Sequence, residues 1–139
     1  MAKYRDNLPQ LDGGIYLTDG GLETTLIFHD NLDLPCFAVF PLLRDENEFA
    51  KIYKYYSTYA EIAVKNNMGF ILESCTWRAS SGWGEKLGYS KSDLELANFR
   101  AVELLEDIRN EYESEHSKMV ISGCLGPRGD GYIVTDLMT

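Results

Sequence analysis

The stretch that decides the fold runs from Phe70 to Trp83 and reads FILESCTWRASSGW. It begins as a short apolar run and turns polar at Glu73, a pattern typical of a buried parallel strand that opens into a loop. In sheets built from strand–helix repeats, ligands bind at the carboxyl ends of the strands. This loop, which also carries both tryptophans of the chain, is therefore a candidate site.

Two neighbouring segments repeat the plan of a strand followed by a polar loop. Short β-prone runs occupy residues 15–18 and 119–122. The first ends at Asp19, ahead of two glycines that tolerate positive φ, and a short helix is expected over 22–28. The second opens into the glycine-rich loop 123–131. Because helical crossovers link the strands, we expect parallel pairing, with all three carboxyl ends at one edge.

Apolar residues at helical spacing predict two long helices between these strands. The first is expected over 46–65, behind an Asp45 cap, and Gly69 is expected to close it in a left-handed turn. The second is expected to begin at a capping box formed by Ser92 and Glu95. Together these elements predict an α/β fold of parallel strand–helix repeats.

The composition is that of one globular domain over residues 1–139, with 45% hydrophobic and 12% aromatic residues. The net charge of −9 argues against nucleic acid and against an anionic membrane, since both bind basic faces. The longest uncharged apolar run, 34–43, is broken by two prolines and is shorter than the ~20 residues that span a bilayer. With no signal-peptide core and three widely spaced cysteines, we expect a cytoplasmic protein.

Asp19 and Glu73 place two carboxylates at the ends of the first two strands. Such a pair can act as acid and base or hold a ligand ammonium group, but helix capping or loop hydrogen bonding would explain it equally well. Neither loop contains a histidine for a Ser/His or Cys/His pair. The backbone amides of 123–131 could cradle a carboxylate, although this loop lacks the lysine of a phosphate-binding P-loop.

Cys75 and Cys124 follow the second and third predicted strands. As metal ligands they would need two further soft ligands nearby, and the chain has no CxxC or HxxxH spacing. Small buried side chains are the simpler explanation. We therefore expect no metal site from this chain alone.

Three motifs taken together resemble a known family. They are TDGGLET at 18–24, ESCTWRAS at 73–80 and SGCLGPRGD at 122–130. In this order and spacing they resemble the amino-terminal part of the homocysteine S-methyltransferase family, with its betaine-, S-methylmethionine- and cobalamin-dependent branches. The resemblance extends from about residue 15 to residue 132.

The resemblance implies a (β/α)8 TIM barrel that transfers a methyl group to the thiol of homocysteine or a related amino acid, as in methionine synthesis. The donor would be of the onium type or a cobalamin. It also implies a zinc ion that binds the thiol and keeps it as thiolate. The residues that match the family's amino-acid pocket are Asp19, Gly20, Gly21, Glu73, Ser74 and Thr76.

The chain also departs from the family pattern. The zinc cysteines of the family lie in late strands, in Gly-x-Asn-Cys-like and Gly-Gly-Cys-Cys motifs, and neither motif occurs here. A full barrel takes ~250 residues, so we expect these residues to form about three strands of a truncated barrel that is inactive alone. Its open sheet edges predict self-association or pairing with a complementary barrel fragment. The alternative is a small self-sufficient α/β ligand-binding or interaction module without methyltransferase activity.

Overall fold

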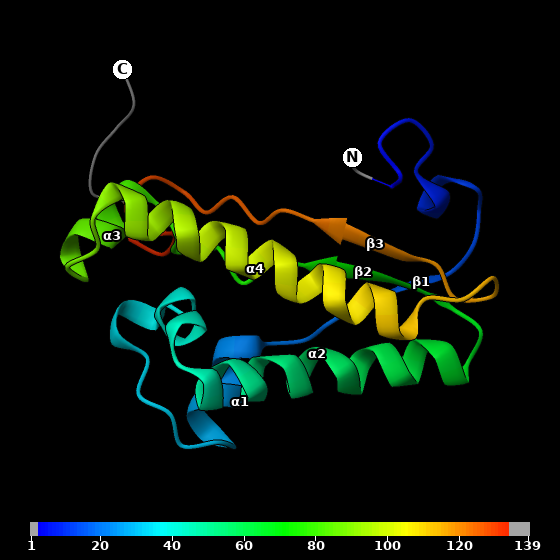
Figure 1. Ribbon diagram of the computed structural model, residues 1–139, viewed down its shortest axis with the longest axis horizontal. Helices are drawn as coiled ribbons and strands as arrows, with labels where there is room; N and C mark the ends of the chain where they lie inside the picture. The colour runs from blue at the N-terminus through cyan, green and yellow to red at the C-terminus, as the bar shows by residue number, and fades with distance from the viewer. Residues whose placement is uncertain (1–2, 134–139) are drawn as a thin grey trace.

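Three parallel strands form one open sheet in the computed structural model, which describes residues 3–133 (Figure 1). The strands are β1 (Tyr16–Thr18), β2 (Gly69–Glu73) and β3 (Met119–Ser122), and β2 lies in the middle. Both pairings are parallel; that of β1 with β2 ends at Ile71, and that of β2 with β3 extends to Glu73, the last residue of β2. The predicted parallel strand–helix repeat is therefore confirmed, and the carboxyl ends of all three strands lie at one edge.

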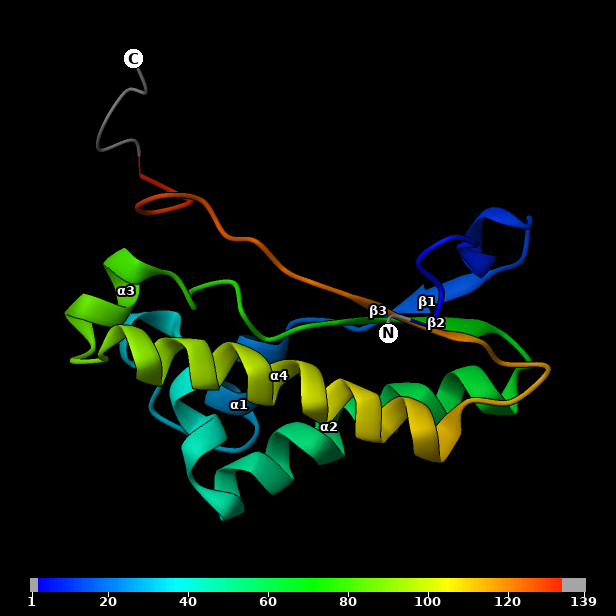
Figure 2. The same cartoon turned by 45° about the horizontal axis from the view of Figure 1, so that its top comes forward.

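Two long helices lie side by side against one face of the sheet (Figures 1 and 2). They are α2 (Glu46–Lys65) and α4 (Lys91–Tyr112), each forming the crossover between two strands. No α-helix of residues 3–133 covers the opposite face of the sheet (Figure 2). The remaining helical elements are α1 (Leu22–Phe28), α3 (Ser81–Lys86) and the 3-10 segments Pro9–Leu11, Pro35–Phe37 and Phe40–Arg44.

The core lies between the sheet and these two helices. Phe70 and Leu72 of β2 are fully buried against apolar side chains of both helices, whereas Ile71 between them is only half-buried. This alternation follows from the period of two along a strand. Except for Tyr55, which was not predicted, the core residues of these helices lie on the predicted faces; the full set is Ile52, Tyr55, Tyr56, Ala60, Ala63, Ala97, Ala101, Leu104, Leu105 and Ile108.

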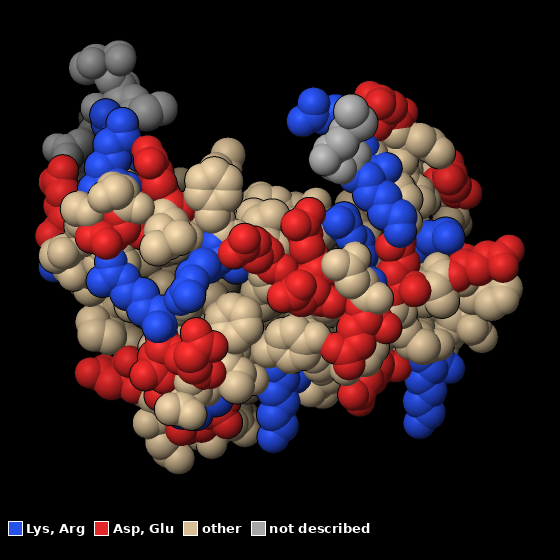
Figure 3. Space-filling view, viewed as in Figure 1, with Lys and Arg blue, Asp and Glu red and all other residues tan. Residues whose placement is uncertain are grey.

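The outward face of α4 is acidic. Glu103, Glu106 and Asp107 are exposed there, and Asp and Glu side chains gather over this part of the surface (Figure 3). No helix of residues 3–133 is long and apolar enough to cross a membrane.

The ends of the long helices agree only in part with prediction. Asp45 caps α2 as expected, because its carboxylate accepts hydrogen bonds from two backbone N–H groups at 2.9 and 3.1 Å. The prediction for the cap of α4 was wrong, because Ser90 and Asp93 form the capping box, two residues earlier than the predicted Ser92 and Glu95. The left-handed turn after α2 was also wrongly placed, since Asn67 takes it with a φ of 51°.

Gly69 has a different role from the one predicted. It is the first residue of β2 and lies against the ring of Tyr16 on β1. A Cβ at position 69 would come within 2.2 Å of that ring, so glycine is required for close packing of the two strands.

Candidate functional site

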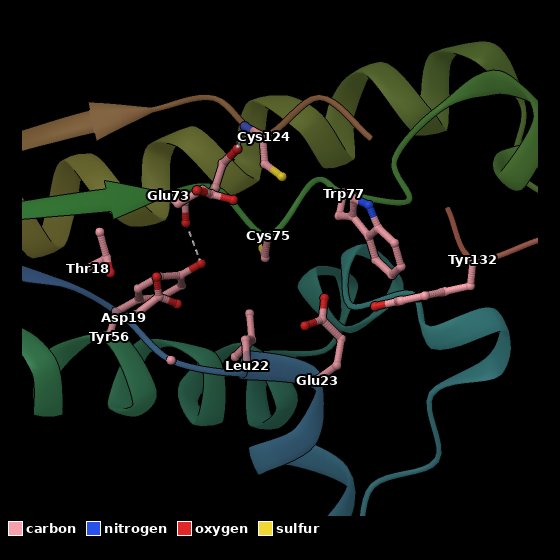
Figure 4. Close-up of a pocket in the computed structure, with 12 residues that line it drawn as sticks. Thr18, Asp19, Leu22, Glu23, Tyr56, Glu73, Cys75, Trp77, Cys124 and Tyr132 are labelled. Carbon is pink, nitrogen blue, oxygen red and sulfur yellow. Dashed lines mark hydrogen bonds between the residues drawn. The ribbon is translucent and has the colours of Figure 1, made fainter. Parts of the chain in front are cut away.

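A cavity of about 410 Å³ opens at the carboxyl edge of the sheet (Figure 4). Segments that follow all three strands contribute to it, as the sequence predicted, together with one residue of α2. Its lining residues are Thr18, Asp19, Gly20, Leu22, Glu23, Tyr56, Glu73, Ser74, Cys75, Trp77, Cys124 and Tyr132. The convergence of three sequence-distant loops makes this the candidate site.

Asp19 is a partly buried carboxylate of the cavity. Burial raises its pKa, and the hydrogen bond that it accepts from the Tyr55 hydroxyl at 3.1 Å opposes this effect. The nearby carboxylates of Glu73 and Glu23 raise the pKa further, because they disfavour a second negative charge. Asp19 therefore holds a proton more readily than an ordinary aspartate, as a base in an active site must.

Glu73 presents its carboxylate to solvent while its backbone is fixed. The Tyr56 hydroxyl, on the buried side of the strand, donates to the Glu73 carbonyl oxygen at 2.6 Å (Figure 4). Beyond it, the Ser74 Oγ accepts from the Cys124 amide at 2.9 Å. These bonds fix the end of β2 to its neighbours, so the Glu73 carboxylate projects from a rigid support.

The electrostatic character of the cavity is strongly negative. Three carboxylates line it, those of Asp19, Glu23 and Glu73, and no lysine or arginine of the described chain does so. Carboxylates gathered in a cleft with partly apolar walls attract cations. The cavity is thus suited to a ligand that carries an ammonium or another positive group.

Comparison with known families identifies the chain. A family model described as homocysteine S-methyltransferase matches residues 16–136. The chain belongs to the homocysteine S-methyltransferase family. No curated protein and no solved structure gives a significant match. The matched segment includes all three strands and every residue that lines the cavity.

The predicted residues of the family's amino-acid pocket do not all reach this cavity. Asp19, Gly20, Glu73 and Ser74 line it, whereas Gly21 and Thr76 do not. Gly21 is the N-cap residue of α1, and its carbonyl oxygen accepts the first helical hydrogen bond.

Thr76 is buried behind the cavity. Its hydroxyl donates to the Cys124 carbonyl oxygen at 2.8 Å and lies 2.7 Å from the Ser74 Oγ. Its bonds join the loops after β2 and β3. Substrate contact by any of the six predicted residues stays a prediction.

The residues present do not fit the zinc ion of the homocysteine S-methyltransferase family. Burial raises the pKa values of Cys75 and Cys124 to about 12, which disfavours their thiolate forms in the metal-free protein. Zinc binds the thiolate form and needs several such ligands together. Residues 3–133 contain no group of three His, Cys, Asp or Glu side chains that could hold a metal ion.

Several cavity residues were not predicted from the sequence. Tyr56 lies on the core face of α2 and was expected only to pack, although a hydroxyl on an apolar face indicates a polar partner. Glu23 and Tyr132 had no distinguishing pattern. Gly20 was expected to serve a positive φ, but it instead allows close approach, since a Cβ there would lie 2.6 Å from the Tyr59 hydroxyl.

Proposed function

We propose that this protein takes part in methyl transfer to the thiol of homocysteine or a related thiol amino acid, which the cavity at the carboxyl edge holds. Membership of the family supports the reaction class. The observation that carries the assignment of the site is the cluster of Asp19, Glu23 and Glu73 around one cavity without a lysine or arginine among its described lining residues.

The acidic cluster suits the ammonium group of an amino acid. A charge-assisted hydrogen bond from the ammonium to a carboxylate is stronger than a neutral one, and the Glu73 carboxylate is accessible for it. Asp19 is a better proton acceptor than an ordinary aspartate because burial raises its pKa. We assign Glu73 to ammonium binding and Asp19 to a role as proton acceptor for the substrate.

The proposed reaction is a displacement at carbon. The substrate thiol loses its proton, its sulfur forms a bond to the methyl carbon, and the bond from that carbon to the donor breaks with its electron pair left on the donor. No step is assigned to zinc bound by residues 3–133. We propose that the zinc of the family, where it takes part, has its ligands elsewhere.

An adjoining cavity favours an onium-type methyl donor. It has a volume of about 560 Å³ and shares Glu23, Trp77 and Tyr132 with the first cavity, while Phe37 adds a third aromatic ring. Arg78 also lines this cavity, but its charge is paired with Asp130, so the aromatic faces and the Glu23 carboxylate are left to favour a positively charged group. Because the two cavities share these residues, a donor in one would lie next to a thiol in the other, as the displacement requires.

The family also leads us to propose a larger assembly in a cytoplasmic setting. β1 and β3 are the edge strands among the described residues, and each has one side without a strand partner there. We propose that further strands pair with them in a (β/α)8 barrel, supplied by a second copy or by a complementary segment. Light scattering on a size-exclusion column would test this, and a stable monomer at high concentration would contradict it.

Calorimetry with a matched pair of thiols tests the assignment of the site. L-homocysteine and 4-mercaptobutanoate share the thiol and the carboxylate, but only the first has an amine. We expect L-homocysteine to bind at least about tenfold more tightly, because a hydrogen bond to a charged group contributes roughly 1.5–3 kcal/mol. Glu73→Gln should remove this preference.

A distant carboxylate provides the control. Glu103→Gln changes the same charge on the outer face of α4, remote from the cavity, and should leave both affinities unchanged. Equal binding of the two thiols by the unaltered protein, or no binding at millimolar concentration, would contradict the proposed site.

A further inference from the structure

Arg78 is a buried residue of the loop after β2, and it also lines the adjoining cavity. Only 5% of the residue is exposed, and its guanidinium carbon lies 4.1 Å from the ring centroid of Trp77 and 3.9 Å from that of Trp83. Both tryptophans of the chain therefore lie against one arginine. Contacts at this distance between a cation and an indole ring are attractive, and more so when water is excluded.

The same guanidinium bonds to the loop that follows β3. Its Nη1 donates to the Gly129 carbonyl oxygen at 3.3 Å, and its Nη2 lies 3.5 Å from the Asp130 carboxylate. The Trp83 indole N–H donates to the same Gly129 oxygen at 3.1 Å. Arg78 and Trp83 thus both bind the loop at the Gly129 carbonyl oxygen.

This loop carries part of the cavity wall. The Asp130 carboxylate accepts a hydrogen bond from the Tyr132 amide at 2.8 Å, and the Tyr132 ring meets the Trp77 ring edge-on, with centroids 6.0 Å apart. Trp77 and Tyr132 line both cavities. Arg78 contacts the back of Trp77 and, through Asp130, fixes the segment that carries Tyr132.

The loop also approaches its support very closely. A Cβ at Gly126 would lie 1.8 Å from the Trp77 carbonyl oxygen, so only glycine permits this contact. The close approach places the loop backbone directly on the segment that contains Arg78. The loop is therefore docked along its length, at Gly126 and again at Gly129 and Asp130.

An arginine here carries a cost that a packing residue would avoid. Its Nε is buried and has no hydrogen-bond partner among residues 3–133. An unpartnered buried N–H is unfavourable, and an apolar side chain of similar volume would not incur it. A planar guanidinium can, however, stack on indole rings while its outer nitrogens bond a carbonyl and a carboxylate, which lysine cannot do.

We propose that Arg78 is a positioning residue, which docks the loop 126–132 against Trp77 and thereby sets the wall that Trp77 and Tyr132 contribute to both cavities. The docking itself stands on the contacts above. Its effect on ligand affinity rests on the proposed function, since it assumes that the first cavity binds a thiol amino acid.

The test compares Arg78→Lys with Lys86→Met in the full chain. Both variants alter a cation that contacts Trp83, but the Lys86 amine lies 4.1 Å from that ring without bonding the loop. Hydrogen exchange of the 126–132 amides reports docking directly. We expect Arg78→Lys to speed this exchange at least about tenfold through local opening, and Lys86→Met to leave it unchanged.

Two further measurements keep the proposal falsifiable. Asp130→Asn removes the negative charge that faces Arg78 from the loop, and this position lies away from the core. The variant should speed hydrogen exchange of the same amides, so it tests docking even if Arg78→Lys does not fold. Calorimetry should show weaker L-homocysteine binding by Arg78→Lys, by about tenfold, because small displacements of a wall are costly. Tryptophan emission should shift in the same variant.

The outcomes separate the two proposals. Unchanged exchange in both Arg78→Lys and Asp130→Asn, or an equal rise in Lys86→Met, would overturn the docking role. Faster exchange with unchanged L-homocysteine affinity would overturn the role in setting the wall. If the unaltered protein binds no L-homocysteine while Arg78→Lys still opens the loop, the docking role is supported and the proposed function fails.

Discussion

The helix-covered face of the sheet and its carboxyl edge are built from the same strands but have opposite properties. On the covered face, Phe70 and Leu72 are completely buried beneath α2 and α4. At the edge, directly after Leu72, Glu73 and Ser74 face an acidic cavity. The buried part of β2 thus stabilises the fold, whereas the end of β2 lines the cavity. Substitutions in the first region should mainly lower the free energy of unfolding, and those in the second should mainly change ligand affinity.

Phe70→Ala should produce the largest loss of stability. Removing a fully buried aromatic ring from the covered face is expected to lower the free energy of unfolding by about 3–5 kcal/mol. Urea unfolding would measure it, with Ile71→Ala as the control because that side chain is only half-buried. Equal losses in the two variants would show that the faces of β2 do not differ as described.

Tyr56→Phe should have an intermediate effect in both regions, because this side chain joins them. Its ring packs in the core and its hydroxyl donates to the Glu73 carbonyl oxygen at 2.6 Å. Loss of the hydroxyl leaves that oxygen without this donor, at a cost of roughly 1–3 kcal/mol in unfolding free energy.

Tyr53→Phe is the matched control for that measurement. Tyr53 lies on the same helix and its hydroxyl donates to Glu111 at the surface, where the bond exchanges readily with water. We expect calorimetry to show weaker L-homocysteine binding by Tyr56→Phe alone. If Tyr53→Phe lowers stability and affinity as much, the link between core and edge is not specific.

The covered face was largely predictable from the sequence, because it depends on local periodicity. Helix positions, strand positions and parallel pairing follow from spacings of apolar residues within one element and from the crossover rule. The cap of α4 did not follow, since Ser90 with Asp93 and Ser92 with Glu95 satisfy the same spacing. The structure decides between them, because the Leu94 amide donates to the Ser90 carbonyl oxygen at 3.0 Å and the helix has therefore begun before Ser92.

The carboxyl edge was predictable only in outline. Convergence of the three strand ends follows from topology, and Asp19 and Glu73 follow from their places after strands. Tyr56 and Tyr132 reach the same cavity from distant parts of the chain, and such contacts leave no periodic pattern. The docking of Gly129 onto Arg78 is likewise a tertiary contact, across a separation of 51 positions.

Asp19→Asn should change stability least, and in the favourable direction. Burial raises the pKa of Asp19 in the folded protein above the value of about 3.9 that is usual for the unfolded chain. The folded state therefore binds this proton more tightly than the unfolded state, and the stability contributed by the protonated group is lost as pH rises through the raised pKa. An asparagine cannot ionise, so it avoids this loss and still offers an oxygen to the Tyr55 hydroxyl.

The decisive measurement for Asp19 is the difference in stability between the unaltered protein and Asp19→Asn as a function of pH. Thermal unfolding at about pH 2–3, well below both pKa values, should give equal stability, because the aspartate is then protonated in both states. As the pH rises from there through the raised folded pKa, the variant should become the more stable protein and then keep a constant advantage. L-homocysteine binding near neutral pH should nevertheless be weaker in the variant, because one negative charge of the cavity is gone. A variant that is less stable near neutral pH would show that the Asp19 carboxylate supports the fold, and the contrast between a stabilising face and a site-bearing edge would then fail at this residue.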